Sequence, residues 1–428
     1  MKKKTVEQKI HGRKIKTPGM IYSILGAVWK AFVYKKYNVN YVFKTDIKNQ
    51  KGPFILISNH ASRLDYIFTG VPMLPRRMNY VAGYNEFHRS HLTGVFGLLK
   101  VIPKKNFTPD VHTIMGIDRV IKNGGSVCIF PEGMSSISGA NQPVASGTGM
   151  LLKRYNVPVY YALIKGGYLT SPKYNLNDRF GKVEVEFDKL FTPDELKSLT
   201  PEEVEDIVNS SLYHDDYAWN KKQGNHYSIA ENGAERLESL LYWCPRCKKE
   251  HTMIGEGNTI RCKSCGNSAT LKDTYEMIPF DDECVIPETQ TEWFNMEREM
   301  VRNAVSAADF ELTEDVELGM LPKYKMLKNQ ATSEIVGEGK ITLNRTGLTY
   351  TGTKDGEAFS FHIDIKSLPT YGMCTDVSRF YTFYKGVFME FYPKNNTVEK
   401  FFMATEELHR INGGIWQDFK FEKVPSKA

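Results

Sequence analysis

The sequence has no apolar run suited to crossing a lipid bilayer as a single helix. Near the N-terminus, residues 17–29 carry no charge, but this stretch of thirteen residues is short of the roughly twenty that a spanning helix needs. No signal-peptide cleavage site follows it. Cysteine is also scarce, with seven in 428 residues, and its spacing suits a reducing compartment rather than a disulfide framework. We therefore expect a cytoplasmic protein.

A second absence concerns nucleophiles. The sequence has no Gly-x-Ser-x-Gly elbow, the sharp turn that presents a serine nucleophile in many hydrolases. Cys128 lies inside an apolar, strand-like run, where we expect it to be buried. A covalent serine or cysteine intermediate is therefore disfavoured, and proton transfer by other side chains is the chemistry to look for.

Positive charge exceeds negative charge by only six, and this excess lies in one place. Residues 1–16 contain seven basic residues against Glu7, a balance of +6, so the rest of the chain is neutral. A nucleic-acid-binding domain should carry a basic face, which argues against that class of partner. The seven basic residues are Lys2, Lys3, Lys4, Lys9, Arg13, Lys14 and Lys16.

An apolar stretch, residues 20–37, follows this basic tail and is interrupted by Lys30. Its apolar side chains recur at helical spacing, at Ile21, Ile24, Leu25, Val28, Trp29, Phe32 and Val33. A basic tail beside an amphipathic helix favours the surface of an anionic membrane. We expect residues 1–40 to hold the protein peripherally on the inner face of the cell membrane. A core helix with a solvated tail is the alternative.

Two motifs follow strand-like runs. Residues 54–58 read as a buried strand, after which come Asn59, His60 and, four residues further on, Asp65. A second run, residues 126–130, ends in Pro131, Glu132 and Gly133. A histidine beside a carboxylate can take a proton from a hydroxyl at neutral pH, because an imidazole titrates in that range and the carboxylate fixes its tautomer. A satisfied core histidine and a turn glutamate are the alternative interpretation.

Strand and helix patterns alternate from residue 54 to residue 162. Such alternation predicts an α/β fold with a mostly parallel sheet and helices on its faces. Ligands in these folds bind outside the carboxyl ends of the strands, where both motifs should lie.

Residues 59–65, Asn-His-Ala-Ser-Arg-Leu-Asp, and residues 130–133, Phe-Pro-Glu-Gly, resemble the first and third motifs of the glycerolipid acyltransferase superfamily, which includes bacterial 1-acyl-sn-glycerol-3-phosphate acyltransferases. The resemblance implies an O-acyltransferase of phospholipid biosynthesis that takes an acyl group from acyl-CoA or acyl carrier protein to a lysophospholipid acceptor. It implies catalytic roles for His60 and Asp65. It implies substrate binding by Asn59, Arg63, Lys104, Lys105, Glu132 and Gly133.

The sequence departs from the family pattern at positions that should contact the acceptor. The second motif usually ends in an arginine, where this chain has Lys104 and Lys105, and lysine supplies charge without a bidentate fork. Met134 and Ser135 replace the Thr-Arg pair that usually follows the third motif, and Tyr161 stands where the fourth motif commonly has a second proline. Another polar lipid or glycolipid acceptor, and a non-catalytic lipid-binding scaffold, therefore stay open as alternatives.

Four cysteines form two Cys-x-x-Cys pairs, Cys244 with Cys247 and Cys262 with Cys265, separated by fourteen residues. This spacing is typical of a structural zinc site of the zinc-ribbon type, in which four thiolates leave no open position for catalysis. Two disulfides or redox pairs are the alternative. Cys284 and Cys374 should be plain thiols.

From residue 305 the sequence pattern of the C-terminal third changes to alternating apolar and polar residues. Alternating runs, a Lys354-Asp355-Gly356 hairpin signal, a short strand at 401–403 and a closing helix at 405–419 resemble a pleckstrin-homology-like domain, a small barrel-like fold with a C-terminal helix. We expect a tail at 1–40, an acyltransferase domain at 41–230, a helix and zinc ribbon at 231–275, a linker at 276–304 and this domain at 305–428.

Overall fold

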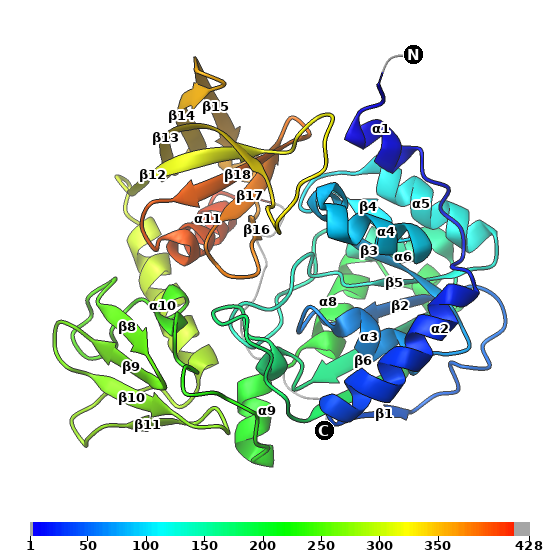
Figure 1. Cartoon of the computed structure of the whole chain (residues 1–428), viewed down its shortest axis with the longest axis horizontal. Helices are drawn as coiled ribbons and strands as arrows, with labels where there is room; N and C mark the ends of the chain where they lie inside the picture. Colours follow the sequence, from blue (N-terminus) through cyan, green and yellow to red (C-terminus); the bar gives the residue numbers. More distant parts are fainter. Residues whose placement is uncertain (1–2, 415–428) are drawn as a thin grey trace.

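The computed structural model describes residues 3–414, and its chain runs through three sheets in turn (Figure 1). A seven-stranded sheet comes first, a four-stranded sheet follows, and a second seven-stranded sheet closes the chain. Two expected features reach beyond the described residues. They are Lys2 of the basic tail and the end of the closing helix, up to residue 419.

The first sheet is mostly parallel, as the alternation predicted. Its strands are β1 (Val39–Phe43), β2 (Ile55–Ser58), β3 (Met78–Gly83), β4 (Ile102–Lys104), β5 (Ser126–Ile129), β6 (Val159–Lys165) and β7 (Val183–Phe191), in the order β1-β7-β6-β2-β5-β3-β4. The five strands from β6 to β4 run parallel, whereas β7 is antiparallel to β6 and pairs with β1. The carboxyl ends of β2 and β5 therefore lie side by side.

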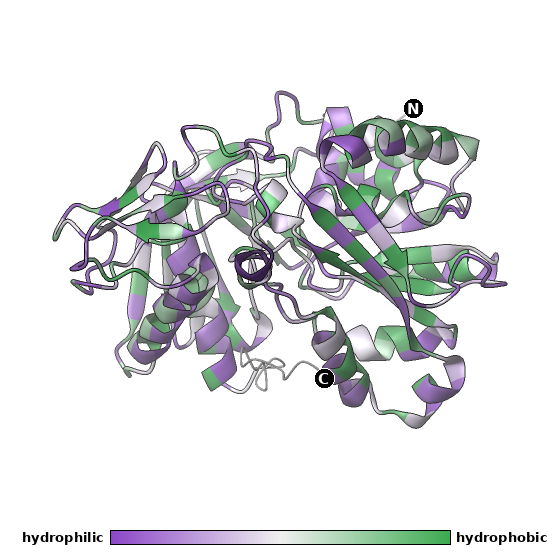
Figure 2. Cartoon of the chain, turned by 90° about the horizontal axis from the view of Figure 1, so that it is seen from below, coloured by the Kyte–Doolittle hydropathy of each residue, from purple (hydrophilic) through white to green (hydrophobic). Residues whose placement is uncertain are grey.

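Helices lie on both sides of this sheet (Figure 2). One face is covered by α2 (Met20–Trp29), α3 (Asp65–Gly70) and α4 (Ser90–Leu98), the other by α5 (Val111–Lys122), α6 (Thr148–Tyr155) and α8 (Pro201–Leu212). Because successive side chains of a strand point to opposite faces, Leu56 joins the first core and Ile55 and Ile57 the second. Three further helices belong to this part: α1 (Val6–His11), α7 (Pro193–Ser198) and α9 (Asp216–Gln223).

The apolar stretch near the N-terminus forms α2 and a π-helical turn, Lys30–Tyr34. One side packs into the domain through Tyr22 and Tyr34, both buried. The opposite side leaves large apolar side chains in solvent, with Ile24 60% and Phe32 71% exposed. Among the described residues, no helix combines the length and the hydropathy that crossing a membrane requires.

The four-stranded sheet carries the cysteine pairs. Its antiparallel strands are β8 (Met253–Glu256), β9 (Thr259–Cys262), β10 (Ser268–Leu271) and β11 (Met277–Pro279). The helix expected directly before the first cysteine pair is wrong, because residues 229–242 form turns and a single 3₁₀ turn at Leu237–Ser239. The reason is a contact with the sheet: the Ala234 N–H donates to the Gly257 carbonyl in the β8–β9 turn, at 2.8 Å.

The segment 276–304, which we expected to be a linker, instead holds β11 and α10 (Gln290–Val305). Its apolar residues recur at helical spacing, and Trp293, Phe294 and Val301 are buried. This helix packs against α11 (Val398–Ile411) of the C-terminal part.

The last sheet is antiparallel. Its strands are β12 (Glu311–Met320), β13 (Glu334–Asn344), β14 (Gly347–Lys354), β15 (Glu357–Asp364), β16 (Gly372–Met373), β17 (Phe380–Tyr384) and β18 (Val387–Pro393), in the order β15-β14-β13-β12-β18-β17-β16. The predicted hairpin is present, and its turn residues Asp355 and Gly356 both have positive φ, as a type I′ turn requires. The closing helix begins at Val398, so residues 401–403 are helical and not a strand.

One end of the C-terminal sheet contacts the first domain. The connection between β12 and β13 meets the start of α4, where the Ser90 N–H donates to the Leu327 carbonyl at 2.9 Å. The β17–β18 turn meets Lys105, whose Nζ donates to the Gly386 carbonyl at 2.9 Å. Ser90 comes after β3 and Lys105 after β4, just as His60 comes after β2. Both contacts therefore lie at the carboxyl ends of the parallel strands of the first sheet, where the predicted site residues are found.

Candidate active site and cysteine cluster

The structure brings His60 and Asp65 together. His60 follows β2, and Asp65 is the first residue of α3, so the short loop between them turns the carboxylate back toward the ring. His60 Nδ1 lies 2.7 Å from Asp65 Oδ2. Because Asp65 accepts at Nδ1, the imidazole carries its proton there and presents the lone pair of Nε2. The His60 side chain is 26% exposed, so the ring is partly buried and partly accessible.

Asp65 is almost fully buried, and its carboxylate is held by more than the histidine. The Ser62 N–H donates to both of its oxygens, at 3.0 and 2.9 Å, and Ser62 Oγ donates to Oδ1 at 3.1 Å. Burial raises the pKa of Asp65 above its ordinary value, while the hydrogen bonds from His60 and Ser62 act in the opposite direction. These bonds fix the carboxylate in one orientation toward the ring.

Glu132 holds the backbone around the histidine. Its Oε1 accepts from the His60 N–H at 2.7 Å, and its Oε2 accepts from the Gln142 N–H at 2.7 Å. The His60 carbonyl accepts in turn from the Ser136 N–H at 2.7 Å. Burial raises the pKa of Glu132 well above its ordinary value, against these two backbone donors. In this arrangement the carboxylate binds the chain itself and ties the third motif to the first.

Asn59 has a similar structural contact. Its Nδ2 donates to the Ile164 carbonyl at 2.8 Å, and its Oδ1 accepts from the Ile164 N–H at 2.7 Å. The amide thus continues the pairing of β2 with β6 one residue beyond the end of β2. This contact fixes where the chain leaves the sheet, and so where His60 begins.

Aromatic rings enclose one face of the histidine. The Phe130 ring stacks on His60 with centroids 4.7 Å apart, and Tyr80 stacks behind Phe130 at 6.4 Å. Cys128, two residues before Phe130, is fully buried as expected, and burial raises the pKa of its thiol. A buried neutral thiol is a poor nucleophile, which agrees with its assignment as a packing residue.

Gly133 lies where the second and third motifs meet. Its φ is +81°, and a Cβ built there would come within 3.0 Å of the Phe107 ring. The Gly133 carbonyl accepts from Asn106 Nδ2 at 2.8 Å. A side chain at this position would therefore meet both backbone strain and a close neighbour, which explains the glycine.

The three predicted basic residues lie in different surroundings. Arg63 pairs with Asp178 and donates to the Leu176 carbonyl at 2.9 Å. Lys104 is the last residue of β4, and burial lowers its pKa. Lys105 donates to the C-terminal part and lies 3.6 Å from Glu7 of α1. The structure thus gathers His60, Asp65, Asn59, Glu132 and Gly133 closely, and gives Arg63 and Lys105 partners of their own.

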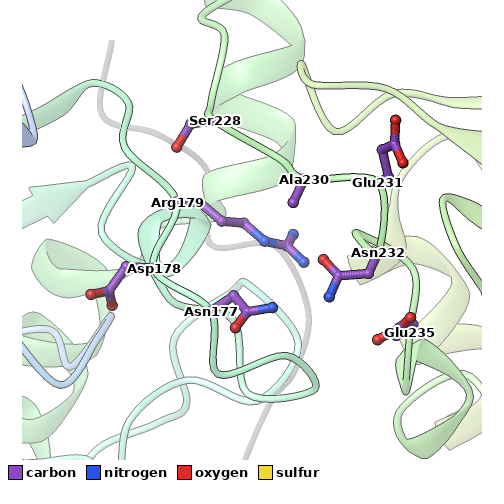
Figure 3. Close-up of a pocket in the computed structure, with 8 residues that line it drawn as sticks. All are labelled: Asn177, Asp178, Arg179, Ser228, Ala230, Glu231, Asn232 and Glu235. Atoms are coloured by element: carbon purple, nitrogen blue, oxygen red, sulfur yellow. The ribbon is translucent and has the colours of Figure 1, made fainter.

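A pocket of about 570 Å³ lies beyond Arg63, between residues 177–179 and 228–235 (Figure 3). Its lining includes three carboxylates, Asp178, Glu231 and Glu235. Arg179 points toward Asn232 in Figure 3, but its guanidinium already donates to Tyr174, Tyr275 and the Gly233 carbonyl. The net negative lining disfavours an anionic ligand in this pocket.

The four paired cysteines converge at a single point. Their sulfur atoms all lie within 4.8 Å of one another, with Cys244 Sγ 3.6 Å from Cys265 Sγ and Cys247 Sγ 3.7 Å from Cys262 Sγ. Four sulfurs placed tetrahedrally about 2.3 Å from a zinc ion would be about 3.8 Å apart, so the arrangement fits that metal. These separations are far longer than a disulfide bond of about 2.05 Å. The cluster could therefore hold one metal ion with four sulfur ligands.

Three supporting residues were missed in the sequence. Ser62 lies inside the first motif, and its spacing of three from Asp65 is a turn signal that could have identified it. Ser136 and Gln142 lie in a Gly- and Ser-rich loop with no distinguishing pattern, and their backbone groups act irrespective of side chain. Backbone donors of this kind cannot be found from residue types.

Comparison with known proteins finds a family model that matches part of the first domain. Residues 38–165 match the family model described as Acyltransferase. A comparison with curated proteins found no match. Among solved structures, the chain is similar to the 1-acyl-sn-glycerophosphate (LPA) acyltransferase, PlsC, from Thermotoga maritima, with 19% identity, a TM-score of 0.37, and coverage of 45% of this chain and 77% of that chain. The residues that match the family model contain His60, Asp65 and Glu132.

Proposed function

We propose that the protein transfers a fatty acyl group from acyl-CoA or acyl carrier protein to the hydroxyl of a lysophospholipid. The favoured acceptor is 1-acyl-sn-glycerol 3-phosphate, and the product is then phosphatidic acid, a precursor in phospholipid biosynthesis. The observation that carries the proposal is the His60–Asp65 pair, in which the carboxylate holds Nδ1 and leaves the lone pair of Nε2 on a partly exposed ring.

The reaction follows from this geometry. His60 Nε2 takes the proton of the acceptor hydroxyl as its oxygen attacks the thioester carbonyl. The carbon–oxygen bond forms, the carbon–sulfur bond breaks, and the proton on His60 passes to the departing thiolate. Asp65 balances the charge that His60 carries between these steps. No covalent enzyme intermediate is needed, because the thioester is already activated.

Binding of the acceptor headgroup is proposed for the cationic and small residues around the pair. Arg63, Lys104 and Lys105 supply positive charge near the carboxyl ends of β2 and β4. Gly133 contributes through the backbone of its loop, because the Phe107 ring fills the space where a side chain would lie. Glu132 and Asn59 contribute through the loop that they hold, because both of their polar ends already bind backbone.

We also propose that residues 1–37 dock the enzyme on anionic membrane. The α2 helix lies on the same face of the sheet as α3, which begins with Asp65. The outer side of α2 and of the π-helical turn after it exposes Met20, Ile24, Val28 and Phe32. These side chains suit the region below lipid headgroups, and the basic tail beside them suits an anionic surface. A lysophospholipid acceptor resides in the membrane, so the site and the docking surface should share a face. The proposed location is peripheral, on the inner face of the cell membrane and in contact with the cytoplasm.

The remaining parts receive structural roles in the proposal. The four-cysteine cluster holds zinc, as a zinc ribbon does, and has no open position for substrate. The C-terminal sheet and α11 form a pleckstrin-homology-like domain. Neither part supplies a group to the His60–Asp65 pair.

The test is incubation of purified protein with acyl-CoA, or with acyl carrier protein loaded with the same chain, and a panel of lysophospholipids and glycolipids. Lipid mass spectrometry should detect one diacyl product above the others, with 1-acyl-sn-glycerol 3-phosphate as its precursor. The His60→Ala variant should yield none. Equal product from the variant, or no product from any donor and acceptor, would contradict the proposal.

A further inference from the structure

The connection between β12 and β13, residues 321–333, is an anchored loop with a charged outer side. Its inner side packs Leu321 and Met326 against the core beneath α2 and α3, and Leu327 is buried. Its outer side exposes Lys323, Tyr324, Lys325 and Lys328, with Tyr324 47% exposed. The burial on one side means that these lysines are held in place rather than carried on a free tail.

This loop is bonded to two elements of the first domain. The Val6 N–H of α1 donates to the Lys323 carbonyl at 2.9 Å. At the other end, the Leu327 N–H donates to the His88 carbonyl at 2.8 Å, and Leu327 forms a parallel bridge with Arg89, directly before α4. Figure 1 shows the yellow loop beside α1 and above α4. Segments more than three hundred residues apart in the sequence therefore form one surface.

Positive charge prevails on this surface. The exposed lysines are Lys3, Lys4 and Lys9 from the α1 segment and Lys323, Lys325 and Lys328 from the loop. Two carboxylates accompany them: Glu7, which lies near Lys105, and Glu334, which pairs with Lys325 at 2.6 Å. Six lysines against two glutamates leave a net charge of +4.

Exposed apolar side chains lie on α4, the helix that begins beside this loop. Along α4, which begins beside Leu327, Val95 is 41% and Leu98 48% exposed. The chain that joins α1 to α2 passes along this helix, with Arg13 against Gly97. Nucleic acid and acidic proteins would satisfy the lysines but would leave these apolar side chains without a partner. A bilayer with anionic headgroups satisfies both.

We propose that the 321–333 loop and α1 together form one docking surface for an anionic lipid bilayer, so that the C-terminal part contacts the membrane directly. This proposal rests on the proposed function, because an enzyme whose acceptor lies in the membrane must bind the membrane surface. The loop would orient the enzyme as well as bind it, because a contact from the C-terminal part, added to the contact from α2, restricts how the enzyme can rotate on the membrane.

The experiment is co-sedimentation of full-length protein with vesicles of phosphatidylcholine alone or with about one-third phosphatidylserine. The K323E/K325E/K328E variant should bind the anionic vesicles at least about tenfold more weakly than wild type, since each basic residue near such a surface contributes measurably. The milder K323Q/K328Q variant keeps the Lys325–Glu334 pair and should lose about threefold. This milder variant tests the proposal if the three charge reversals disturb the fold of the loop.

The matched control is K340E/K366E/K394E, three exposed lysines of the C-terminal part, which lie in β13, in the 3₁₀ turn Ile365–Ser367 and directly after β18. Lys340 and Lys394 both lie beside Asp315, toward the opposite end of β12 from the loop. This control changes net charge by the same amount and should alter binding by less than about twofold. All three variants should keep near-normal transfer to a short-chain soluble acceptor, because none of these lysines lies at the His60–Asp65 pair.

Equal binding by the loop variants and the control would overturn the proposal, and so would equal binding of wild type to neutral and anionic vesicles. Loss of activity with acyl carrier protein, without loss of vesicle binding, would assign the surface to that protein instead. If wild type transfers no acyl group to any acceptor, the proposed function fails, yet the difference in vesicle binding still decides whether the loop is a docking surface.

Discussion

The His60–Asp65 site and the four-cysteine cluster are both built on short motifs, but they are assembled differently. The cysteines lie within 22 residues of chain, and two local turns bring their sulfurs together. The histidine depends on contacts with Glu132 and Ile164, which are 72 and 105 residues away from their partners in sequence. The geometry of the cysteine cluster should therefore depend on its own metal ion. The geometry of the histidine site should depend on the pairing of whole strands.

The largest effect is expected from removing the metal. Purified protein should contain one zinc ion per chain, and a strong chelator should unfold the β8–β11 region. Binding of structural zinc is worth about 10–16 kcal/mol in small zinc-finger peptides, more than an ordinary domain has in stability. Elemental analysis and hydrogen exchange over residues 244–279 measure the two effects, and transfer by the first domain should persist longer than protection of this region.

Cys262→Ser and Cys284→Ser form a matched pair for this prediction. Cys284 is a nearby thiol outside the cluster, whose Sγ accepts from the Ser268 N–H at 3.5 Å. The first variant should lose zinc and the second should retain it. A zinc content below about a tenth of an ion per chain, in wild-type protein purified under reducing conditions, would contradict the prediction of a structural zinc site.

The next largest effect is expected at the catalytic pair. His60→Ala should lower kcat by about 10²- to 10⁴-fold, the usual contribution of a positioned general base, and Asp65→Asn should be nearly as damaging because Asn cannot balance the imidazolium. The thermal midpoint of His60→Ala should change little, since the ring is partly exposed.

The chain offers a second histidine–carboxylate pair as a control. His226 Nδ1 lies 2.8 Å from Asp273 Oδ2, and these side chains are 71% and 53% exposed. The two pairs share one geometry and differ in burial and neighbours. His226→Ala should therefore leave transfer within about twofold of wild type. Similar losses in both variants would mean that the His60 effect is not specific to catalysis.

The sequence predicts one of these two sites more completely than the other. The Cys-x-x-Cys spacing contains its whole ligand set, and the spacing of His60 from Asp65 contains the pair. The contact of Glu132 with the His60 N–H could not be predicted from the sequence. It requires β5 to lie beside β2, and residue types alone do not determine the order of strands in a sheet. The same holds for Lys105, whose partner Gly386 lies 281 residues further on.

A smaller effect separates two roles for Glu132. Glu132→Gln keeps the shape of the side chain but sets an amide NH₂ against a backbone N–H donor, which should cost about 1–3 kcal/mol in unfolding free energy. A positioning role predicts a lower thermal midpoint and a lower kcat with KM nearly unchanged. A role in binding acceptor hydroxyls predicts instead a raised KM at unchanged stability. Chemical denaturation and steady-state kinetics on the same preparation distinguish the two.

The smallest effect is expected at a buried carboxylate remote from both sites. Glu399 of α11 is 2% exposed, and neither of its oxygens has a hydrogen-bond partner among the described residues. Burial raises its pKa well above the ordinary value, Arg298 acts to lower it, and Glu406 raises it further. Glu297 and Tyr242 also interact electrostatically with it. A carboxyl whose pKa is raised in the folded protein favours folding below its unfolded-state pKa, and this contribution is lost as pH rises through the folded-state pKa.

Glu399→Gln removes that dependence, so the variant should melt higher than wild type by about 2–4 °C at pH 8 and by less at pH 5.5. Glu311→Gln, at an exposed position of β12, should show no such trend with pH. A difference between Glu399→Gln and wild type that stayed constant with pH would mean that Glu399 does not titrate on unfolding, and that its burial is balanced by the charge of Arg298.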